Sequence, residues 1–459
     1  MRICVSWFFL FAALCGAQQP ADWIVTARFV VTMDPTRRVI ENGAVAVGAG
    51  RILAVGPRTE IDRRYRAKQR LDRPESLLAP GLINTHTHAP MSLLRGIADD
   101  LRLQEWLEKY IFPAEAKNVT PDFVRWGTRL AALEMMLSGT TTFADMYYFE
   151  EVIAEAAKEA GLRGVLGQTV IGFPVPDAKT PEIGLARTGK FLERFRGDPL
   201  ITAAVAPHSM YTVSPETLKA TRALANRHGA PLLIHVAETL KEREDSLTAH
   251  RQSPVQYLDR LGVFDGRTLA AHCVHVDEDD IRLLAHRGVG VAHCPSSNMK
   301  LASGAAPVAA LLEADVAVGL GPDGPAGSNN DFSLFEEMDL AAKLQKLVRR
   351  DPQALPARTA FEMATVRGAR ALGMEKEIGS LEPGKRADLI TVRLDRPHAV
   401  PMWDVYSQLV YASKGADVLD VFVQGRLIVR GARPLTMDPV VVLQKAREYQ
   451  RSIRQSLSR

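Results

Sequence analysis

Short apolar runs alternate with amphipathic segments through the middle of the chain, from about residue 80 to residue 377. One unit begins at Ser214, a helix-capping residue followed by Pro215, and its helical periodicity ends at Gly229. Strand-like runs follow at 232–234, 268–271, 288–292 and 316–320. Repeated strand–helix units of this length predict a parallel sheet with helical crossovers. Of the two folds considered, a (β/α)8 barrel and a doubly wound sheet, the barrel is favoured, since no Gly-rich phosphate loop follows a first strand.

Both ends of the chain are rich in strand-like segments. The first block contains a hairpin of 44–47 and 51–55 around Gly48-Ala49-Gly50, and the second contains 387–392 and 418–423. Neither block could bury a good core alone, so we expect one small β-sandwich domain built from both chain ends. The predicted divisions are a signal peptide (1–17), the two parts of the small domain (21–79 and 378–434), the barrel (80–377) and a helical tail (435–459).

The first seventeen residues have the pattern of an export signal. Arg2 precedes an apolar run from Ile3 to Leu14, and small residues follow up to Ala17, the expected cleavage point. About twelve apolar residues are too few to span a bilayer comfortably. We therefore expect a periplasmic or secreted protein. The alternatives are an uncleaved anchor and a misassigned start codon, and without a signal peptide the protein would be cytoplasmic. A lipoprotein is disfavoured because Leu14 precedes Cys15, where a small residue is expected.

Composition excludes several other classes of protein. Hydrophobic residues make up 46% and charged residues 24% of the 459 residues, as expected for a folded globular chain. The formal net charge is only +4 and no dense Lys/Arg stripe occurs, which disfavours nucleic-acid binding. Cys273 and Cys294, the cysteines beyond the predicted signal, each follow a histidine at the end of an apolar run, so we expect small core residues. The oligomeric state stays open, a homo-oligomer included.

Titratable residues recur where apolar runs end. Six such runs lead to His86 and His88, His208, His235 and Glu238, His272, His293, and Asp323. In parallel barrels the catalytic groups lie at the carboxyl ends of the strands, where the loops converge. The pattern therefore predicts a single site that gathers residues from many strands. For His293 we expect a structural or supporting role, because Pro295 and a polar turn follow it.

A metal site is predicted from the His86-Thr87-His88 sequence. Residues two apart on a strand point to the same side, so both imidazoles can reach one ion. In isolation such a pair could equally be two surface or core histidines. With His235 and Asp323 the donor set becomes three imidazoles and one carboxylate, which suits Zn²⁺, or alternatively Fe²⁺, with a position left for water.

The acids and the histidine nearby suggest hydrolytic chemistry. A bound metal lowers the pKa of water from about 15.7 to about 7. Asp323 could take the proton of that water, Glu238 could deliver a proton to the leaving side of the substrate, and His272 could orient the hydroxide or stabilise developing charge.

Several motifs resemble those of a known family. The segment 80–88 resembles the first-strand signature of the amidohydrolase superfamily, and the segments around Glu115, His208, His235, His272 and Asp323 are similar to its branch that deaminates S-adenosylhomocysteine and 5′-methylthioadenosine. The resemblance covers about residues 23–430. It implies one metal on His86, His88, His235 and Asp323, with Glu115 and His208 as substrate contacts. Without it, Glu115 would be interpreted as an acid on a helix surface.

The function expected from this resemblance is hydrolytic deamination of an aminopurine nucleoside of the adenosine, methylthioadenosine or S-adenosylhomocysteine type. Metal hydroxide would attack C6, Glu238 would protonate the adjacent ring nitrogen, and ammonia would leave. The stretch 172–188, where basic residues would face the amino-acid tail of S-adenosylhomocysteine, does not match clearly, and Lys179 and Arg187 are only candidates there.

Three other functions are alternatives to nucleoside deamination. The same machinery could displace amine or chloride from another heterocycle such as a guanine, pterin or triazine. A metal-binding protein without turnover is disfavoured because both Glu238 and His272 are present. A peptidase of the same fold is disfavoured because the strand before His208 ends without a lysine that could be carboxylated to bridge two metals.

Overall fold

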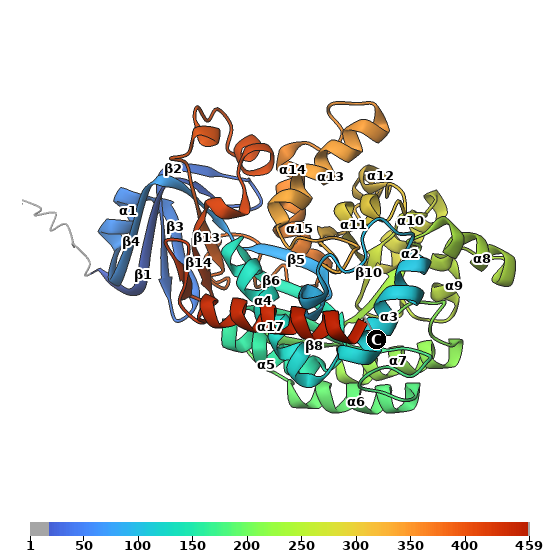
Figure 1. Cartoon of the computed structure of the whole chain (residues 1–459). Helices are drawn as coiled ribbons and strands as arrows, with labels where there is room; N and C mark the ends of the chain where they lie inside the picture. Colours follow the sequence, from blue (N-terminus) through green and yellow to red (C-terminus); the bar gives the residue numbers. More distant parts are fainter. Residues whose placement is uncertain (1–17, 458–459) are drawn as a thin grey trace, which may run out of the picture.

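The computed structural model describes residues 18–457 (Figure 1). Eight parallel strands close into a barrel in the order β10-β11-β12-β5-β6-β7-β8-β9, which confirms the predicted fold. The strands are β5 (Leu82–Thr87), β6 (Thr140–Tyr147), β7 (Arg163–Val170), β8 (Ile201–Pro207), β9 (Leu232–Val236), β10 (Thr268–His272), β11 (Gly290–His293) and β12 (Val318–Leu320). The predicted signal peptide, 1–17, lies outside the described residues.

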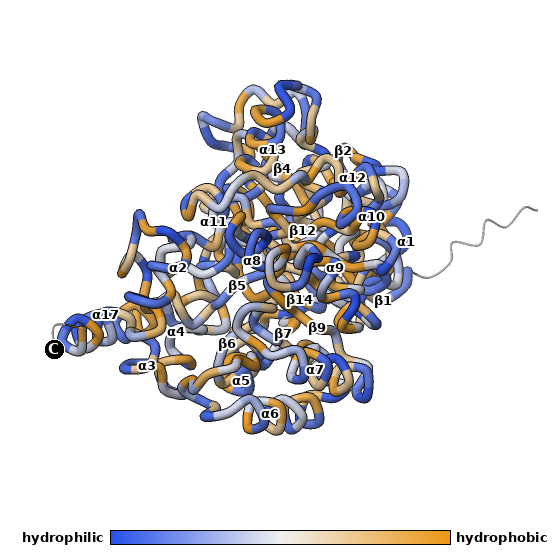
Figure 2. Tube along the Cα trace, turned by 90° about the vertical axis from the view of Figure 1, so that its right-hand side faces the viewer, coloured by the Kyte–Doolittle hydropathy of each residue, from blue (hydrophilic) through white to orange (hydrophobic). Residues whose placement is uncertain are grey.

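Helices surround these strands. In Figure 2 the labelled barrel strands lie near the middle of the molecule, with α4 to α7 and α10 around them. The helices that follow the barrel strands are α4 (Pro121–Leu137), α5 (Glu150–Ala160), α6 (Pro181–Arg194), α7 (Pro215–His228), α8 (Leu240–His250), α9 (Pro254–Arg260), α10 (Glu278–Arg287), α11 (Pro295–Lys300), α12 (Val308–Glu313), α13 (Leu334–Arg349), α14 (Ala357–Met363) and α15 (Val366–Ala371). As predicted, Ser214 caps α7, accepting a hydrogen bond from the Thr217 amide, and Gly229 ends it in a left-handed conformation.

One long loop carries extra short helices over the carboxyl ends of the strands. It follows β5 and contains η1 (Ala89–Leu94), α2 (Leu103–Glu105), η2 (Trp106–Ile111) and α3 (Phe112–Asn118). The Trp106 indole N–H donates to the Ala326 carbonyl at 2.7 Å, which ties this segment to the loop after β12. The two loops that follow the first and last barrel strands are therefore fastened to each other.

The second domain is an eight-stranded sheet in the order β16-β15-β14-β13-β4-β1-β2-β3. Only β1 and β4 pair in parallel; the other pairs are antiparallel. Its strands are β1 (Gln19–Val31), β2 (Val39–Gly48), β3 (Arg51–Pro57), β4 (Tyr65–Pro80), β13 (Leu389–Arg393), β14 (Val418–Val423), β15 (Arg426–Arg430) and β16 (Arg433–Pro434). The remaining helical segments are α1 (Arg58–Arg64), η3 (Pro397–Ala399), α16 (Val405–Ser407), η4 (Gln408–Ala412), η5 (Gly415–Asp417) and α17 (Pro439–Leu457).

This sheet folds over itself. Trp23 of β1 and Phe422 of β14 have ring centroids 5.3 Å apart, although the two strands are three positions apart in the sheet. In a flat sheet, two strands three positions apart would lie about 14 Å from each other. Two parts of the same sheet therefore face each other across an apolar layer, which confirms the expectation of a small β-sandwich domain that draws on both ends of the chain.

The junction between the two domains is short and tightly packed. Gly81 alone separates β4 from β5, and a Cβ atom at this position would lie 2.2 Å from the Thr141 side chain, so only glycine fits. Arg163 at the start of β7 forms a buried ion pair with Asp388, at 3.1 Å. Asp388 also accepts a hydrogen bond from the Gln424 backbone amide at 2.6 Å, so the Arg163–Asp388 pair joins the barrel to the sheet.

The tail after the sheet is helical. Helix α17 packs against α4, with the Phe123 and Tyr449 rings 5.8 Å apart, and the Tyr449 hydroxyl donates to Asp122 at 2.5 Å. In the part of the chain from 18 to 457, no helix is both long and apolar enough to cross a membrane.

Loss of the junction ion pair should cost far more stability than loss of a surface pair. Arg163→Met leaves the Asp388 carboxylate buried without its partner, so we expect the free energy of unfolding in urea to fall by about 3–5 kcal/mol. The matched control is Arg370→Met, which breaks the exposed pair with Asp315 and should cost about 1 kcal/mol or less. Equal losses in the two variants would contradict this account of the junction.

Candidate active site

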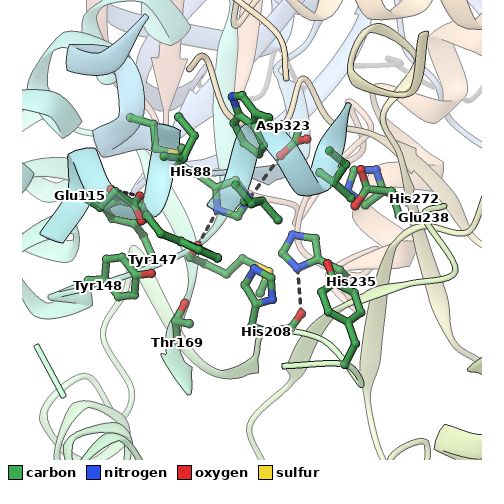
Figure 3. A pocket seen from close by; sticks show the side chains of 18 residues that line it. His88, Glu115, Tyr147, Tyr148, Thr169, His208, His235, Glu238, His272 and Asp323 are labelled. Carbon is green, nitrogen blue, oxygen red and sulfur yellow. Dashed lines mark hydrogen bonds and ion pairs between the residues drawn. The ribbon is translucent and has the colours of Figure 1, made fainter. Parts of the chain in front are cut away.

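Four of the predicted site residues converge at the carboxyl ends of β5, β9 and β12. His86 and His88 each place Nε2 at 3.3 Å from Oδ1 of Asp323. The coordinating atoms available on His86, His88 and His235 all lie within 4.8 Å of one another. Figure 3 shows His88, His235 and Asp323 facing a common point.

Backbone carbonyl groups fix two of these imidazoles. Nδ1 of His88 lies 2.7 Å from the Met146 carbonyl oxygen, and Nδ1 of His235 lies 2.8 Å from that of His208. Because a carbonyl only accepts, each Nδ1 carries the proton, and each Nε2 keeps its lone pair for an ion. Nε2 of His86 is buried without a hydrogen-bond partner, as expected of a nitrogen that binds a metal. The donor set therefore fits one divalent cation.

Asp323 remains ionised in this environment. Burial acts to raise its pKa, but the imidazoles of His86 and His88 beside it outweigh burial and hold the pKa well below its ordinary value. The Ser297 hydroxyl donates to its second oxygen at 2.6 Å. The residue lies in the left-handed region, with φ of 64°, and this turns its carboxylate back toward the histidines.

Glu238 and His272 form a second polar pair beside the first cluster. Glu238 Oε2 and His272 Nε2 are 3.8 Å apart, and Asn298 Oδ1 holds His272 Nδ1 at 2.9 Å. Burial raises the pKa of Glu238. Burial lowers the pKa of His272, but the Glu238 and Asp323 carboxylates outweigh it and the net shift is upward. The pair can therefore hold a proton close to neutral pH.

The backbone at Glu238 is held by another buried acid. Glu242 of α8 accepts the amide hydrogens of Ala237 and Glu238 at 3.0 and 2.9 Å. Ala237 has a φ of 51°, so the chain turns sharply between His235 and Glu238 and presents both side chains to the cavity.

Glu115 lies inside the cavity. The interpretation as a surface acid is wrong, because Glu115 is only 4% exposed and accepts a hydrogen bond from the Tyr147 hydroxyl at 2.5 Å. Burial raises the pKa of Glu115 to about 7, against the opposing effect of Tyr147.

His208 lines the same cavity as Glu115. The ring centroids of His208 and His235 are 4.7 Å apart. Burial, followed by the nearby His88 and His86, lowers the pKa of His208 to about 3, which keeps its imidazole neutral.

The cavity that unites these groups has a volume of about 60 Å³. Its polar side chains come from the strand ends, and an apolar wall comes from the loop after β5, with Leu103, Trp106, Leu107, Ile111 and Phe112. The sequence analysis did not identify this wall, or Tyr147 and Tyr148 after β6, which also line the cavity. The run 140–148, rich in β-branched and aromatic residues, ends in the two tyrosines and was the available signal for them.

Three other predicted residues lie elsewhere. His293 is fully buried, with both ring nitrogens lacking a hydrogen-bond partner, and does not line the cavity. Lys179 is exposed. Arg187 is held by Glu151 at 2.7 Å and lies 3.6 Å from Asp177. Neither basic residue lines the cavity.

A closed parallel barrel with histidine and carboxylate donors at its strand ends places the chain among metal-dependent hydrolases. Comparison with known proteins agrees with this class. The model of the amidohydrolase family matches residues 77–428. The chain belongs to the amidohydrolase family.

Relatives over nearly the full length share one name. The 5-methylthioadenosine/S-adenosylhomocysteine deaminase of Syntrophobacter fumaroxidans is 49% identical over 434 residues, 95% of this chain and 99% of that protein. The one from Thermodesulfovibrio yellowstonii is 46% identical over 436 residues, with the same coverage. Among solved structures, an adenosine deaminase from Xanthomonas campestris with bound zinc is 42% identical, with a TM-score of 0.94, and the match covers 96% of this chain and all of that one.

Removal of one imidazole should empty the metal site. We expect His86→Ala to lose nearly all bound divalent metal, because the remaining donors no longer enclose an ion, and metal analysis of the purified protein would measure this. The control is His286→Ala, which changes an exposed histidine on α10 and should keep the metal. Full occupancy in the His86 variant would remove this residue from the ligand set.

Proposed function

We propose that the protein is a metal-dependent hydrolytic deaminase of an aminopurine nucleoside. The observation that carries the proposal is the placement of the Glu238–His272 pair beside the donor set of three histidines and Asp323, in a cavity that also contains Glu115. The names of the relatives support the same substrate class. We propose His86, His88, His235 and Asp323 as the ligands of one zinc ion; Fe²⁺ would suit the same donors.

In this proposal the residues divide the proton transfers among themselves. When bound, the metal supplies Lewis-acid activation of water near neutral pH. Asp323 accepts a proton from the water that adds to C6 of the purine. Glu238, whose pKa is raised by burial, gives a proton to the adjacent ring nitrogen, and His272 stabilises the charge that develops. Asp323 then passes its proton to the exocyclic nitrogen, and the added oxygen returns a proton to Glu238. The bond from C6 to the exocyclic nitrogen breaks, ammonia leaves and a C6 carbonyl remains.

Glu115 and His208 would orient the nucleoside. A carboxylate can accept hydrogen bonds from two neighbouring ribose hydroxyls, and Glu115 is presented to the cavity from α3 with one oxygen already held by Tyr147. The neutral His208 imidazole has its Nδ1 at 3.1 Å from the Thr212 hydroxyl, which leaves Nε2 to contact substrate.

An ammonia-release assay on metal-loaded protein tests the function. The panel contains adenosine, methylthioadenosine, S-adenosylhomocysteine, guanine and a chlorotriazine, with chloride release measured for the last. Preferred turnover of the nucleosides is expected. Activity confined to the free heterocycles would contradict the nucleoside assignment and would leave Glu115 without a ribose to bind.

Glu238→Gln separates proton transfer from metal binding. We expect kcat for adenosine to fall by about two orders of magnitude or more, because the amide cannot deliver a proton, while metal analysis still finds one ion per chain. Glu313→Gln, an exposed acid on α12, serves as the control with unchanged kcat. Near-normal turnover of the Glu238 variant would exclude this residue from the mechanism.

The role proposed for Glu115 predicts a pH-dependent KM. The pKa of Glu115 is raised to about 7, so this carboxyl is ionised above that pH and protonated below it. Since the protonated form is the poorer hydrogen-bond acceptor, KM for adenosine should rise as the pH falls from 8 to 6. In Glu115→Gln, KM should be higher throughout and should lose this component of its pH dependence. Parallel pH profiles for the two proteins would count against Glu115 as the ribose contact.

A further inference from the structure

A larger groove adjoins the active-site cavity. It has a volume of about 1090 Å³, against about 60 Å³ for the cavity. Leu103, Leu107, Phe112 and Tyr211 line both, so a single layer of side chains separates the two. Because pockets for small ligands measure roughly 300–1,000 Å³, a nucleoside requires the cavity and part of the groove together.

The position of Glu115 relates the groove to the substrate. Glu115, the proposed ribose contact, lines the cavity, and the next residue of α3, Ala116, lines the groove. Figure 3 shows Glu115 at the side of the cavity away from Glu238 and His272. A nucleoside with its base near Glu238 and its ribose at Glu115 therefore directs the 5′-substituent toward the groove.

Apolar residues line the groove where basic residues were expected. The stretch 172–188 does reach the groove, but it contributes Gly172, Phe173, Pro174 and Pro181. The Phe173 ring packs edge-on against Phe112, with centroids 5.2 Å apart. Lys179 and Arg187 of the same stretch do not line the groove, and Arg187 is bound to Glu151 and close to Asp177.

The charged groups that line the groove are acidic. They are Glu108 of η2 and Glu242 and Asp245 of α8. The two cations of α8 do not line the groove: Lys241 pairs with Asp245 at 2.7 Å, and Arg243 pairs with Asp277 and Asp280. Among the described residues that line the groove, His250 is the one side chain of a basic type, and its ring stacks on Tyr257 with centroids 3.8 Å apart.

We infer that this groove receives the 5′-substituent of the nucleoside and selects neutral or cationic substituents over those with a carboxylate. The inference rests on the proposed function. A carboxylate that leaves water for this groove would lose hydration, gain no guanidinium or ammonium partner and face Glu108 and Asp245. A methylthio-type substituent loses no such hydration and packs against Phe112, Phe173 and Met210.

A matched substrate series tests the inference on the wild-type, metal-loaded enzyme. The substrates are adenosine, 5′-S-propylthioadenosine, its 3-aminopropyl and 3-carboxypropyl analogues, and S-adenosylhomocysteine, which carries both charged groups. We expect kcat/KM for the carboxypropyl compound to be lower than for the propyl compound by roughly tenfold or more. The value for S-adenosylhomocysteine should lie between these two. The value for the aminopropyl compound should at least equal that for the propyl compound.

A charge reversal in the groove should move this preference. At low ionic strength, Glu108→Arg should raise the carboxypropyl-to-propyl ratio of kcat/KM by roughly fivefold. Asp245→Arg provides a second variant on a different element, with the same expected direction. The control is Glu41→Arg, the same change of charge at an exposed position on β2 of the other domain, and it should leave the ratio unchanged.

The outcomes separate the inference from the function it rests on. Turnover of adenosine together with equal or better turnover of the carboxypropyl compound would overturn the inference and leave the deaminase function in place. A ratio that shifts equally in Glu108→Arg and Glu41→Arg would also overturn it. Absence of turnover with every nucleoside, adenosine included, would remove the proposed function and the inference with it.

Discussion

The site depends on the contact that closes the barrel between its first and last strands. β12 and β5 pair only at Leu320 and Asn84, and beyond that point the Asp323 amide donates to the His86 carbonyl at 3.1 Å. The Thr87 hydroxyl donates to the Asp323 carbonyl at 2.9 Å. A Cβ on Gly321 would lie 2.7 Å from the His86 oxygen, so the two backbones approach this closely only because residue 321 is glycine. Without this closure, Asp323 would not reach the two histidines.

The short helix α11 then orients the polar groups that this closure brings together. In α11, Ser297 donates to Asp323 at 2.6 Å and the neighbouring Asn298 accepts from His272 at 2.9 Å. Ser296 in turn binds Glu337 of α13, a buried acid whose pKa is raised to about 8 by burial. One rigid element thus fixes both Asp323 and His272, and two consecutive side chains link the two polar clusters. Precise mutual placement of this kind is what proton transfer requires.

The sequence predicted those features whose physical signal is local. Strand periodicity and caps gave the barrel, and His86 and His88 were recognisable because a strand directs alternate side chains to one side. The burial of Glu115 could not be predicted from its own segment, since α3 is a short helix with polar neighbours, and the residue is buried because Tyr147 from a distant strand covers it. The apolar lining of the groove was missed for the same reason, because distant segments form it only after the chain has folded. β12 was predicted as five residues and has three.

Burial alone does not determine the properties of the three carboxyl groups in the cavity. Asp323, Glu238 and Glu115 are all at most 5% exposed, yet the pKa of Asp323 is lowered and the other two are raised. The difference follows from their partners, because Asp323 contacts two imidazoles at 3.3 Å, whereas Glu238 lies 3.8 Å from one and Glu115 is bound to a phenol. An acid with a lowered pKa is suited to stay a carboxylate that binds cations, and one with a raised pKa is suited to carry a proton near neutral pH. The partners of each carboxyl group therefore give the three acids different roles, and for Asp323 the closure of the barrel sets the distance to its two histidines.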